Sequence, residues 1–300
     1  MSIDKIANEL SNYATVEENV PMSSLTSLRI GGNARYVVYP SNVVALNETI
    51  DIIKKYNLPF KVFGKGSNIL CSDNFYDGVI IKLDRSFTEC YFTEDSCIAQ
   101  AGCSIIAVAY EAMRNGLSGL EFASGIPATV GGVTFMNAGA YNSNMAGVIE
   151  EVFIYHDGIF EWISNSKCQF AYRFSVFHEN PDWIIIATKF RLKPKPVEEI
   201  KSLIETRKER RISSQPLDKP SAGSTFKNPG EKPAWELIDG IGYRGKRVGG
   251  AMVSTKHVNF LINEDKATAK DFMELVKQIQ EEVKNKYGVD LYMEVERFNW

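Results

Sequence analysis

Ser224 is the first candidate for chemistry in this chain, because it lies in the turn-like stretch PSAGSTFKNP at residues 220–229. A nucleophilic serine normally works with a histidine base and an orienting carboxylate, but the chain has only three histidines. The Gly-x-Ser-x-Gly elbow of hydrolases is also missing, since Phe226 takes the place of its second glycine. Ser224 is therefore a poor nucleophile, and it remains either a proton donor or a plain turn residue.

Arg173 is the second candidate, and it lies among aromatic residues in the stretch AYRFSVF at 171–177. One interpretation is a surface arginine whose stem covers Phe174 and Phe177. The other is a partly buried, permanently charged group that binds a carboxylate or stabilises a developing enolate. The residues alone leave both open.

Glu294 and Glu296 are the third candidates, in the C-terminal stretch MEVERFNW. In a β-strand, alternate residues point to the same face, so both glutamates would lie on one side of a strand over this stretch. That side is either part of a site or an edge exposed to solvent, and composition does not choose between them.

Two glycine-rich stretches could bind a phosphate-containing ligand. The first, GKGSNIL at 64–70, is neither a Walker motif nor a Rossmann fingerprint, because the glycine spacing fails in both cases. A plain strand and turn is the simpler interpretation. Its two glycines and the Ser-Asn pair that follows would nevertheless let backbone N–H groups converge on an anion.

The second stretch, SGIPATVGGVTFMNAGAY at 124–141, would let the backbone approach a large flat ligand closely. Close helix packing is the alternative explanation of its small residues. Two such stretches in one α/β domain predict a bound dinucleotide. Its phosphates would be held by backbone N–H groups and a helix N-terminus.

Length, composition and charge narrow the class of protein. Three hundred residues favour two domains, and 44% apolar with 24% charged residues is typical of a globular chain. A net charge of −3 argues against nucleic acid as a partner.

Residues 193–260 nevertheless carry fourteen Lys and Arg against eight Asp and Glu. This local excess favours an anion pocket over a solvated basic helix around RKERR at 207–211.

Cysteine usage and the terminal sequence predict a cytoplasmic protein. The five cysteines form no C-x-x-C pair and cannot all be paired, which fits a reducing compartment and gives no zinc spacing or other metal site. The stretch MSIDKIANEL has no signal-peptide core, and apolar runs such as WIIIA at 183–187 are too short to span a bilayer. We therefore expect no membrane insertion.

The first half of the sequence alternates helix and strand patterns. Helices are expected over 41–59 and 104–116, a hairpin over 150–164 with its turn at Asp157-Gly158, and strands over 60–64, 78–83, 96–102 and 183–192. KPKP at 193–196 is typical of a linker because it contains two prolines.

The second half begins with a helix over 197–212 and has a short helix from Ala234. Strands are expected over 247–253, 257–263 and 290–298. A long helix should run from a cap at Thr268, with Asp271 completing a capping box, to Tyr287.

Seven motifs together are more specific than any one of them. In order they are TSLRIGGNARYVVYP, GKGSNIL, SGIPATVGGVTFMNAGAY, YRFS, SAGSTFKNP, GGAMVSTKHVNFLIN and EVE, spanning about Leu25 to Val295. The set closely resembles the UDP-N-acetylenolpyruvoylglucosamine reductases, oxidoreductases that make UDP-N-acetylmuramate for bacterial peptidoglycan and cell wall synthesis. Only about fifty residues separate YRFS from Ser224. That spacing resembles the shorter subclass, which lacks an inserted substrate-covering loop.

The resemblance implies an α+β fold: an FAD-binding domain of the vanillyl-alcohol-oxidase type and a C-terminal α/β substrate domain. The FAD-binding domain would cover residues 1–192, with subdomains of about 1–85 and 86–192, and the substrate domain would cover 197–300. FAD would be bound non-covalently, and NADPH would be the reductant.

The resemblance also carries specific residues over to this sequence. The implied cofactor-binding residues are Gly64, Lys65, Gly66, Ser67, Asn68, Ile69, Ser124, Gly125, Ile126, Pro127, Thr129, Gly131, Gly132, Asn137, Gly139, Ala140 and Tyr141. The implied substrate-binding residues are Tyr172, Arg211, Gln215, Lys227, Asn228, Lys256 and His257.

The implied catalytic residues are Arg173, Ser224 and Glu294. After hydride transfer from FAD N5 to the enolpyruvyl group, negative charge would develop beside the substrate carboxylate. Arg173 and a protonated Glu294 would stabilise it, and Ser224 would give the proton. Thr225, where an aromatic residue is commoner, and the tail RFNW depart from the family pattern.

Two other functions compete with this one. An oxidase of small alcohols on the same scaffold is disfavoured because no histidine or cysteine lies in an identified flavin-attachment motif. A catalytically silent FAD or UDP-sugar binder would have no need for Arg173, Ser224 and Glu294 together.

Overall fold

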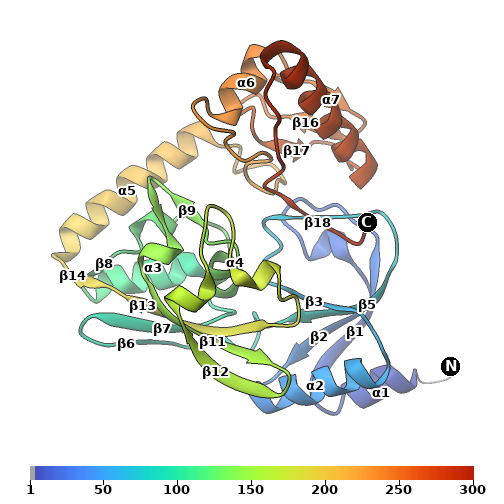
Figure 1. Ribbon diagram of the computed structural model, residues 1–300, viewed down its shortest axis with the longest axis vertical. Coiled ribbons are helices and arrows are strands. Elements are labelled where there is room, and N and C mark those ends of the chain that lie inside the picture. The colour runs from blue at the N-terminus through green and yellow to red at the C-terminus, as the bar shows by residue number, and fades with distance from the viewer. Residues whose placement is uncertain (1–3) are drawn as a thin grey trace. The chain divides into compact units, whose positions relative to one another are not determined.

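The structure of the chain, a computed structural model, describes residues 4–300 (Figure 1). Its contacts group into two compact units whose segments alternate along the sequence. Unit 1 holds the described residues up to Glu18, Tyr36–Lys65 and Gly78–Arg210, and unit 2 holds Asn19–Arg35, Gly66–Asp77 and Arg211–Trp300. Each unit has its own buried apolar core. The predicted domains instead follow one boundary near residues 192–197, and they stay a prediction.

The N-terminal part of the chain forms a four-stranded sheet and two helices. The strand order is β1 (Ala14–Pro21), β2 (Asn33–Pro40), β5 (Tyr76–Lys82) and β3 (Phe60–Phe63), and the helices are α1 (Lys5–Leu10) and α2 (Val43–Lys55). The helix predicted over 41–59 is confirmed as α2. The Asn42 side chain caps it by accepting from the Ala45 N–H at 3.0 Å. The strands predicted over 60–64 and 78–83 are confirmed as β3 and β5, which pair in parallel.

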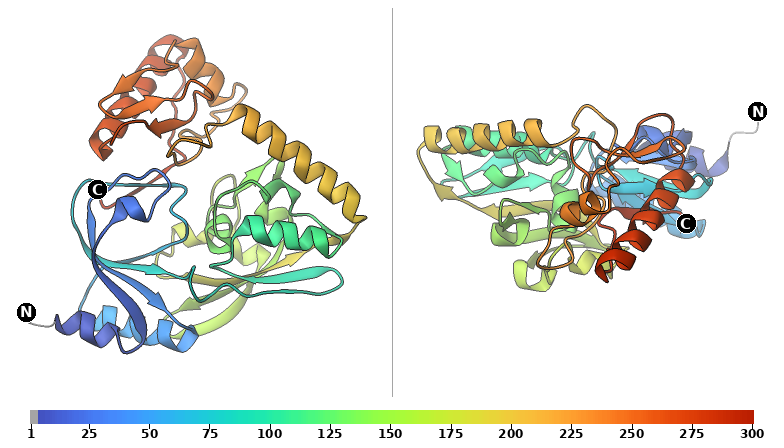
Figure 2. Two further views of the ribbon diagram at one scale, coloured as in Figure 1. Left: turned by 180° about the vertical axis from the view of Figure 1, so that it is seen from behind. Right: turned by 90° about the horizontal axis from the view of Figure 1, so that it is seen from above.

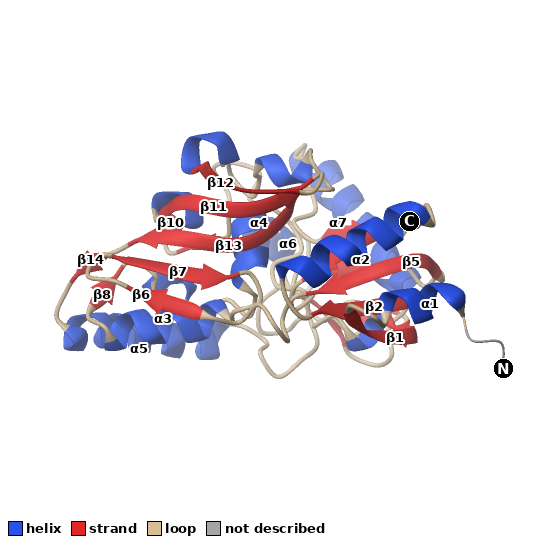
Figure 3. Cartoon of the chain, turned by 90° about the horizontal axis from the view of Figure 1, so that it is seen from below, coloured by secondary structure: helices blue, strands red, loops and turns tan. Residues whose placement is uncertain are grey.

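A five-stranded antiparallel sheet forms the centre of unit 1 (Figure 3). Its order is β12 (Ile159–Ser164), β11 (Ile149–His156), β13 (Ile184–Arg191), β7 (Ser96–Gln100) and β6 (Cys90–Phe92). The predicted hairpin is confirmed, because β11 and β12 turn at Asp157 and Gly158, both with positive φ. The predicted helix near 104–116 is α3 (Ile105–Arg114), and a further helix is α4 (Val130–Phe135).

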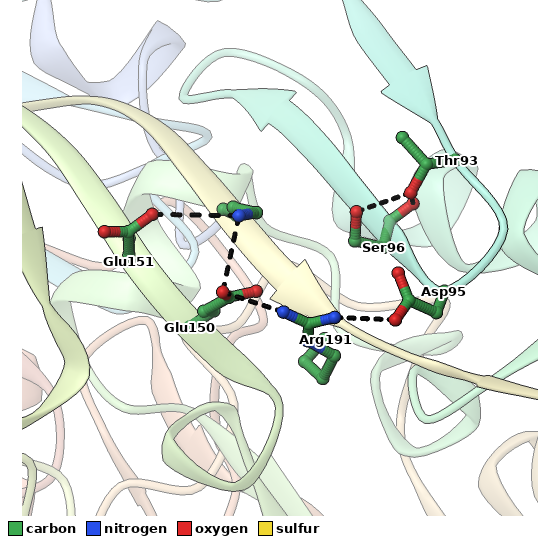
Figure 4. Close-up of polar contacts among 7 residues, drawn as sticks. Thr93, Asp95, Ser96, Glu150, Glu151 and Arg191 are labelled. Atoms are coloured by element: carbon green, nitrogen blue, oxygen red, sulfur yellow. Dashed lines mark hydrogen bonds and ion pairs between the residues drawn. The ribbon is translucent and has the colours of Figure 1, made fainter.

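An ionic cluster lies across β13 and β11 of this sheet, and Figure 4 shows Arg191 between Asp95 and Glu150. Arg191 contacts Asp95 at 2.6 Å and Glu150 at 2.8 Å. The hydrogen bond from Arg191 lowers the pKa of the Glu150 carboxyl. These side chains are partly exposed, so the cluster supports the register of the sheet without dominating its stability.

The KPKP stretch is not wholly irregular, which corrects the linker prediction. Lys193–Pro194 forms a short strand, β14, that pairs with β8 (Leu117–Ser118). The prediction failed because proline is tolerated at the edge of a sheet, where its missing N–H is not needed. The helix predicted over 197–212 follows as α5 (Val197–Ser214).

Unit 2 is built on a three-stranded sheet of β15 (Arg247–Val248), β16 (Ala251–Val253) and β17 (Leu261–Asn263), with helices α6 (Ala234–Gly240) and α7 (Ala269–Tyr287). Figure 2 shows α7 in red beside these strands. Its predicted capping box is confirmed, since Thr268 accepts from the Asp271 N–H and Asp271 accepts from the Thr268 N–H, each at 3.0 Å. The helix buries an apolar stripe that includes Phe272, Ile279 and Val283.

Three predicted strands differ in the structure. The single strand expected over 247–253 is instead a hairpin, because β15 and β16 pair antiparallel. Only Leu261–Asn263 of the strand expected over 257–263 is extended and paired. Of the strand expected over 290–298, only β18 (Glu296–Phe298) forms, paired in parallel with β4 (Ile69–Cys71). Val295 is a buried bend, so the alternation that would place Glu294 and Glu296 on one strand face does not apply.

Candidate functional site

The two glycine-rich stretches meet in unit 1 at Gly64 and Thr129. A Cβ atom at Gly64 would lie 2.4 Å from Thr129 Oγ1, so only glycine fits this position. Thr129 is the N-cap of α4, and its Oγ1 accepts from the Gly132 N–H at 3.2 Å. The structure therefore brings together one predicted cofactor residue from each stretch.

Lys82, which the sequence reasoning missed, lies against the first stretch. The residue is 7% exposed, and its Nζ donates to the Gly64 carbonyl at 2.7 Å and pairs with Asp84 Oδ2 at 3.1 Å. Asp84 Oδ1 is buried and has no hydrogen-bond partner within residues 4–300. A lysine in the otherwise apolar strand GVIIKL was the signal that could have identified this position.

The hydrogen-bond donors around these stretches correct one expectation. The N–H groups of Val130 and Gly131 at the start of α4 donate to the carbonyls of Cys103 and Ala101, each at 2.9 Å. The predicted phosphate site at a helix N-terminus is therefore wrong for α4, because its first amides are already used. The backbone amides of Lys65, Gly66 and Ser67, in contrast, donate to no acceptor in the described part of the chain.

The end of the second stretch forms a tight hairpin of β9 (Gly139–Ala140) and β10 (Ser143–Asn144). Tyr141 and Asn142 are the two turn residues, both with positive φ, as in a type I′ turn. Asn137 precedes the hairpin, and its side chain donates to the Ala171 carbonyl at 2.8 Å and accepts from the Ala146 N–H at 2.9 Å. Asn137 thus links this stretch to the segment that carries Arg173.

Arg173 is half-buried in unit 1 and contacts the same hairpin. Its Nη2 donates to the Gly139 carbonyl at 3.1 Å, and its guanidinium lies 5.3 Å from the ring centroid of Tyr172. The alternative interpretation, a stem covering Phe174 and Phe177, stays a prediction, since these contacts concern the guanidinium alone. The guanidinium is oriented by a hydrogen bond, as a group that binds an anion must be.

Ser224 and Glu294 lie on adjacent segments of unit 2. The Glu294 N–H donates to the Thr225 carbonyl at 2.8 Å, and the Thr225 N–H donates to the Asn259 carbonyl at 2.7 Å. The Asn259 side chain also accepts from the Phe226 N–H at 3.0 Å and donates to the Phe226 carbonyl at 2.9 Å. Within residues 4–300 no group hydrogen-bonds the Ser224 hydroxyl, which is partly exposed. The hydroxyl is therefore available to a ligand on a rigidly held loop.

Comparison with known proteins agrees with this arrangement. Residues 215–298 match the C-terminal domain of UDP-N-acetylenolpyruvoylglucosamine reductase, and residues 34–157 match an FAD binding domain. The chain is 39% identical over 297 residues to the UDP-N-acetylenolpyruvoylglucosamine reductase of Anoxybacillus flavithermus, and 36% identical to that of Bacillus subtilis. Both alignments cover 98% of each chain. This chain belongs to the UDP-N-acetylenolpyruvoylglucosamine reductase family.

The solved structures agree with the sequence relatives. The crystal structure of the reductase (MurB) from Thermus caldophilus superimposes with a TM-score of 0.83 at 35% identity, covering 96% of this chain and 100% of that chain. The expected fold, an FAD-binding domain with the C-terminal domain of the reductase family, is thereby confirmed.

The residues around Gly64 fit the FAD of this family. The unused Lys65 amide and the buried Lys82 ammonium, both in unit 1, would supply a donor and positive charge for its diphosphate. Asp84 Oδ1 is a buried acceptor without a donor. A hydroxyl group of a bound ligand would supply that donor. Which predicted residues contact the flavin stays a prediction.

Three of the predicted substrate residues of this reductase-family chain gather in unit 2. Arg211 Nε donates to Gln215 Oε1 at 2.8 Å, and Lys256 Nζ donates to the Ile212 carbonyl at 2.5 Å. Both contacts lie at the C-terminal end of α5. The structure thus brings two cations of the predicted substrate set to one segment.

His257 and Asn228 have structural partners in the same unit. The His257 ring meets Phe260 edge-on, with centroids 4.8 Å apart, and burial lowers the pKa of its imidazole. Its Nδ1 is buried without a partner among the described residues. Asn228 Oδ1 accepts from the Ala234 N–H at 3.0 Å and so supports the start of α6. Lys227 donates its N–H to the Tyr292 carbonyl at 2.9 Å.

Residues 4–300 contain neither a metal-binding cluster nor a membrane-spanning helix. No group of three or more His, Cys, Asp or Glu is arranged to hold a metal ion there. Each helix in this part of the chain is too short or too polar to cross a membrane.

Proposed function

We propose that this chain reduces the enolpyruvyl group of UDP-N-acetylglucosamine enolpyruvate with FAD and NADPH, giving UDP-N-acetylmuramate. The observation that supports this most is the Ser224 loop, on which a free hydroxyl is held beside the Glu294 segment in a chain of the reductase family. A serine without a histidine base suits the task of giving a proton rather than attacking.

Bound FAD would supply the hydride for the terminal carbon of the enolpyruvyl group. Arg173 would bind the substrate carboxylate and stabilise the negative charge that spreads into it. The Ser224 hydroxyl would donate its proton to the carbon next to the carboxylate, and the Glu294 carboxyl would stabilise the same charge by hydrogen bonding. These assignments explain why the chain combines a cation, a hydroxyl and a carboxyl on separately held segments.

We further propose that residues 1–192 bind FAD and residues 197–300 bind the nucleotide sugar. Lys227, Lys256 and Arg211 would supply positive charge for its diphosphate. The partners would then be small molecules only. A cytoplasmic location is favoured by five cysteines whose number and spacing suit a reducing compartment.

Anaerobic stopped-flow absorbance tests the proposal on the purified, FAD-containing protein. NADPH should bleach the flavin band, and adding UDP-N-acetylglucosamine enolpyruvate should restore it without oxygen. Recovery with oxygen alone would indicate an oxidase, and failure of NADPH to bleach the band would indicate a silent binder. A protein that cannot be reconstituted with FAD would contradict the proposal altogether.

A further inference from the structure

The tip of the β9–β10 hairpin is an unfavourable place for a tyrosine. Ser143 pairs with Ala140, so Tyr141 and Asn142 alone make the turn, with φ of 54° and 57°. Type I′ turns favour Asn, Asp and Gly at both positions, because a bulky side chain is disfavoured in the left-handed region. Such a conformation persists only where neighbouring contacts hold it.

Helix α5 provides these contacts. The Tyr141 hydroxyl donates to the Arg207 carbonyl at 3.1 Å. The guanidinium carbons of Arg207 and Arg210 lie 4.8 and 5.9 Å from the centroid of its ring, within the range of cation–π attraction. The ring remains 38% exposed, so directed contacts, rather than burial, attach it to the helix.

The other end of the same short hairpin contacts Arg173. The Gly139 carbonyl accepts from Arg173 Nη2 at 3.1 Å. A Cβ atom at Gly139 would lie 2.5 Å from the Ser143 carbonyl oxygen, so the two strands are as close as their backbones allow. Arg173 itself has a φ of 55°, which means that its orientation also depends on such contacts. All of these residues belong to unit 1.

We propose that Tyr141 is a positioning residue for Arg173. By attaching the tip of the hairpin to α5, it fixes the Gly139 carbonyl against which the Arg173 guanidinium is oriented. The inference rests on the proposed function, in which Arg173 binds the substrate carboxylate. It gives Tyr141 a role different from the flavin contact expected from the sequence.

Tyr141→Phe and Tyr141→Ala test this role, because the first removes only the hydroxyl and the second also removes the ring. Tyr91→Phe is a matched control, since it removes a tyrosine hydroxyl that donates to Glu89 at 2.6 Å on β6 of the same unit. Both half-reactions are followed by stopped-flow absorbance over a range of substrate concentrations, and FAD content is measured for each variant.

We expect flavin bleaching by NADPH and FAD content to be close to wild type in all three variants. At saturating substrate, the recovery of the flavin absorbance should be about 5-fold slower in Tyr141→Phe, because one hydrogen bond is lost. Tyr91→Phe should not change this rate. Tyr141→Ala should slow it by roughly 10²-fold, as misplacement of a binding group does. Wild-type recovery in both Tyr141 variants would overturn the inference. So would loss of FAD or slow bleaching with normal recovery, which would indicate a flavin contact.

A double-mutant cycle with Arg173→Ala separates this inference from the proposed function. If Tyr141 acts through Arg173, Tyr141→Phe should slow recovery in the wild-type background and have no further effect in the Arg173→Ala background. Independent, multiplying effects would overturn the positioning role while leaving Arg173 in the mechanism. Normal recovery of the flavin absorbance in Arg173→Ala itself would instead remove Arg173 from the proposed function. Tyr141 would then have no catalytic group to position.

Discussion

The side chain of Asn68 holds the backbone of Glu294. Its amide donates to the Glu294 carbonyl at 3.1 Å, and the backbone carbonyl of Asn68 accepts from the Glu296 N–H at 2.9 Å. These two bonds continue the parallel pairing of β4 with β18 to either side of the bend at Val295. Asn68, in the stretch predicted to bind a diphosphate, therefore also holds the backbone that carries the Glu294 carboxyl.

Asn68→Ala should consequently affect the substrate half-reaction. Loss of the amide frees the backbone at Glu294, and flavin recovery by substrate should slow by roughly 10-fold to 10²-fold, as displacement of a catalytic group does. Stopped-flow recovery and fluorimetric titration of the apoprotein with FAD measure the two effects. Asn33→Ala is the control, because it removes an amide hydrogen bond to Asn19, at 2.9 Å, elsewhere in unit 2. Weakened FAD binding with normal recovery would assign Asn68 to the cofactor alone.

Ser224→Ala should separate the two half-reactions. NADPH should bleach the flavin at nearly the wild-type rate, whereas recovery should slow by roughly 10²-fold to 10⁴-fold, the usual contribution of a positioned acid. Ser221→Ala, in the same loop, should leave both rates unchanged, because Ser221 contributes only its backbone carbonyl to a bond with Ser27. Equal recovery rates in the two serine variants would remove Ser224 from the mechanism.

Lys82→Met should weaken FAD binding. The substitution keeps an unbranched side chain but leaves the Gly64 carbonyl without its charged donor and the Asp84 carboxylate without its partner. A hydrogen bond to a charged group is worth about 1.5–3 kcal/mol, so the FAD dissociation constant should rise about 10-fold to 10²-fold. Fluorimetric titration of the apoprotein with FAD measures this change.

Lys54→Met is the matched control for Lys82→Met. Lys54 lies on α2 of the same unit and pairs with Asp157 at 3.3 Å, but its side chain is half exposed, so its loss should not affect FAD. Equal FAD affinities for the two lysine variants would show that Lys82 has no part in the cofactor site.

Elements with local signals were predictable from the sequence. Asn42 before α2, the Thr268–Asp271 capping box before α7 and Asp157-Gly158 between β11 and β12 each specify their structure within a few residues. The missed features depend on distant partners. β14 forms only because β8 lies beside it, and β18 is short because the segment before it is bent.

The candidate site shows the same division. Its glycines and its serine loop stood out by type and spacing, and Gly64 does meet Thr129. The contacts of Lys82 with Gly64 and of Arg207 with Tyr141 were not predictable, because the two partners lie at least 18 positions apart in the sequence. The occupied amides of α4 were likewise hidden, since their acceptors Cys103 and Ala101 belong to another segment.

His257 should make the folding stability depend on pH. Burial, with a smaller effect from the Arg244 charge, lowers the pKa of its imidazole in the folded protein, whereas the unfolded chain should titrate near its ordinary value of about 6.5. The unfolded state therefore binds the proton more tightly. Stability from this residue is complete above about pH 6.5 and is lost as the pH falls toward the lowered pKa.

Urea unfolding of the wild type and of His257→Gln at pH 7.5 and 5.5 measures this contribution. Other titrating groups act equally in both proteins, so the wild type should lose more free energy of unfolding between the two pH values than the variant does. The control variant is His156→Gln, which removes a histidine of unit 1 that pairs with Glu161 at 2.8 Å. Asn259→Ala would be an unsuitable control, because the Asn259 side chain holds the backbone of Phe226. If the wild type and His257→Gln lost the same free energy of unfolding, His257 would bind a proton equally well in the folded and unfolded states. Its burial would then have no influence on stability at acid pH.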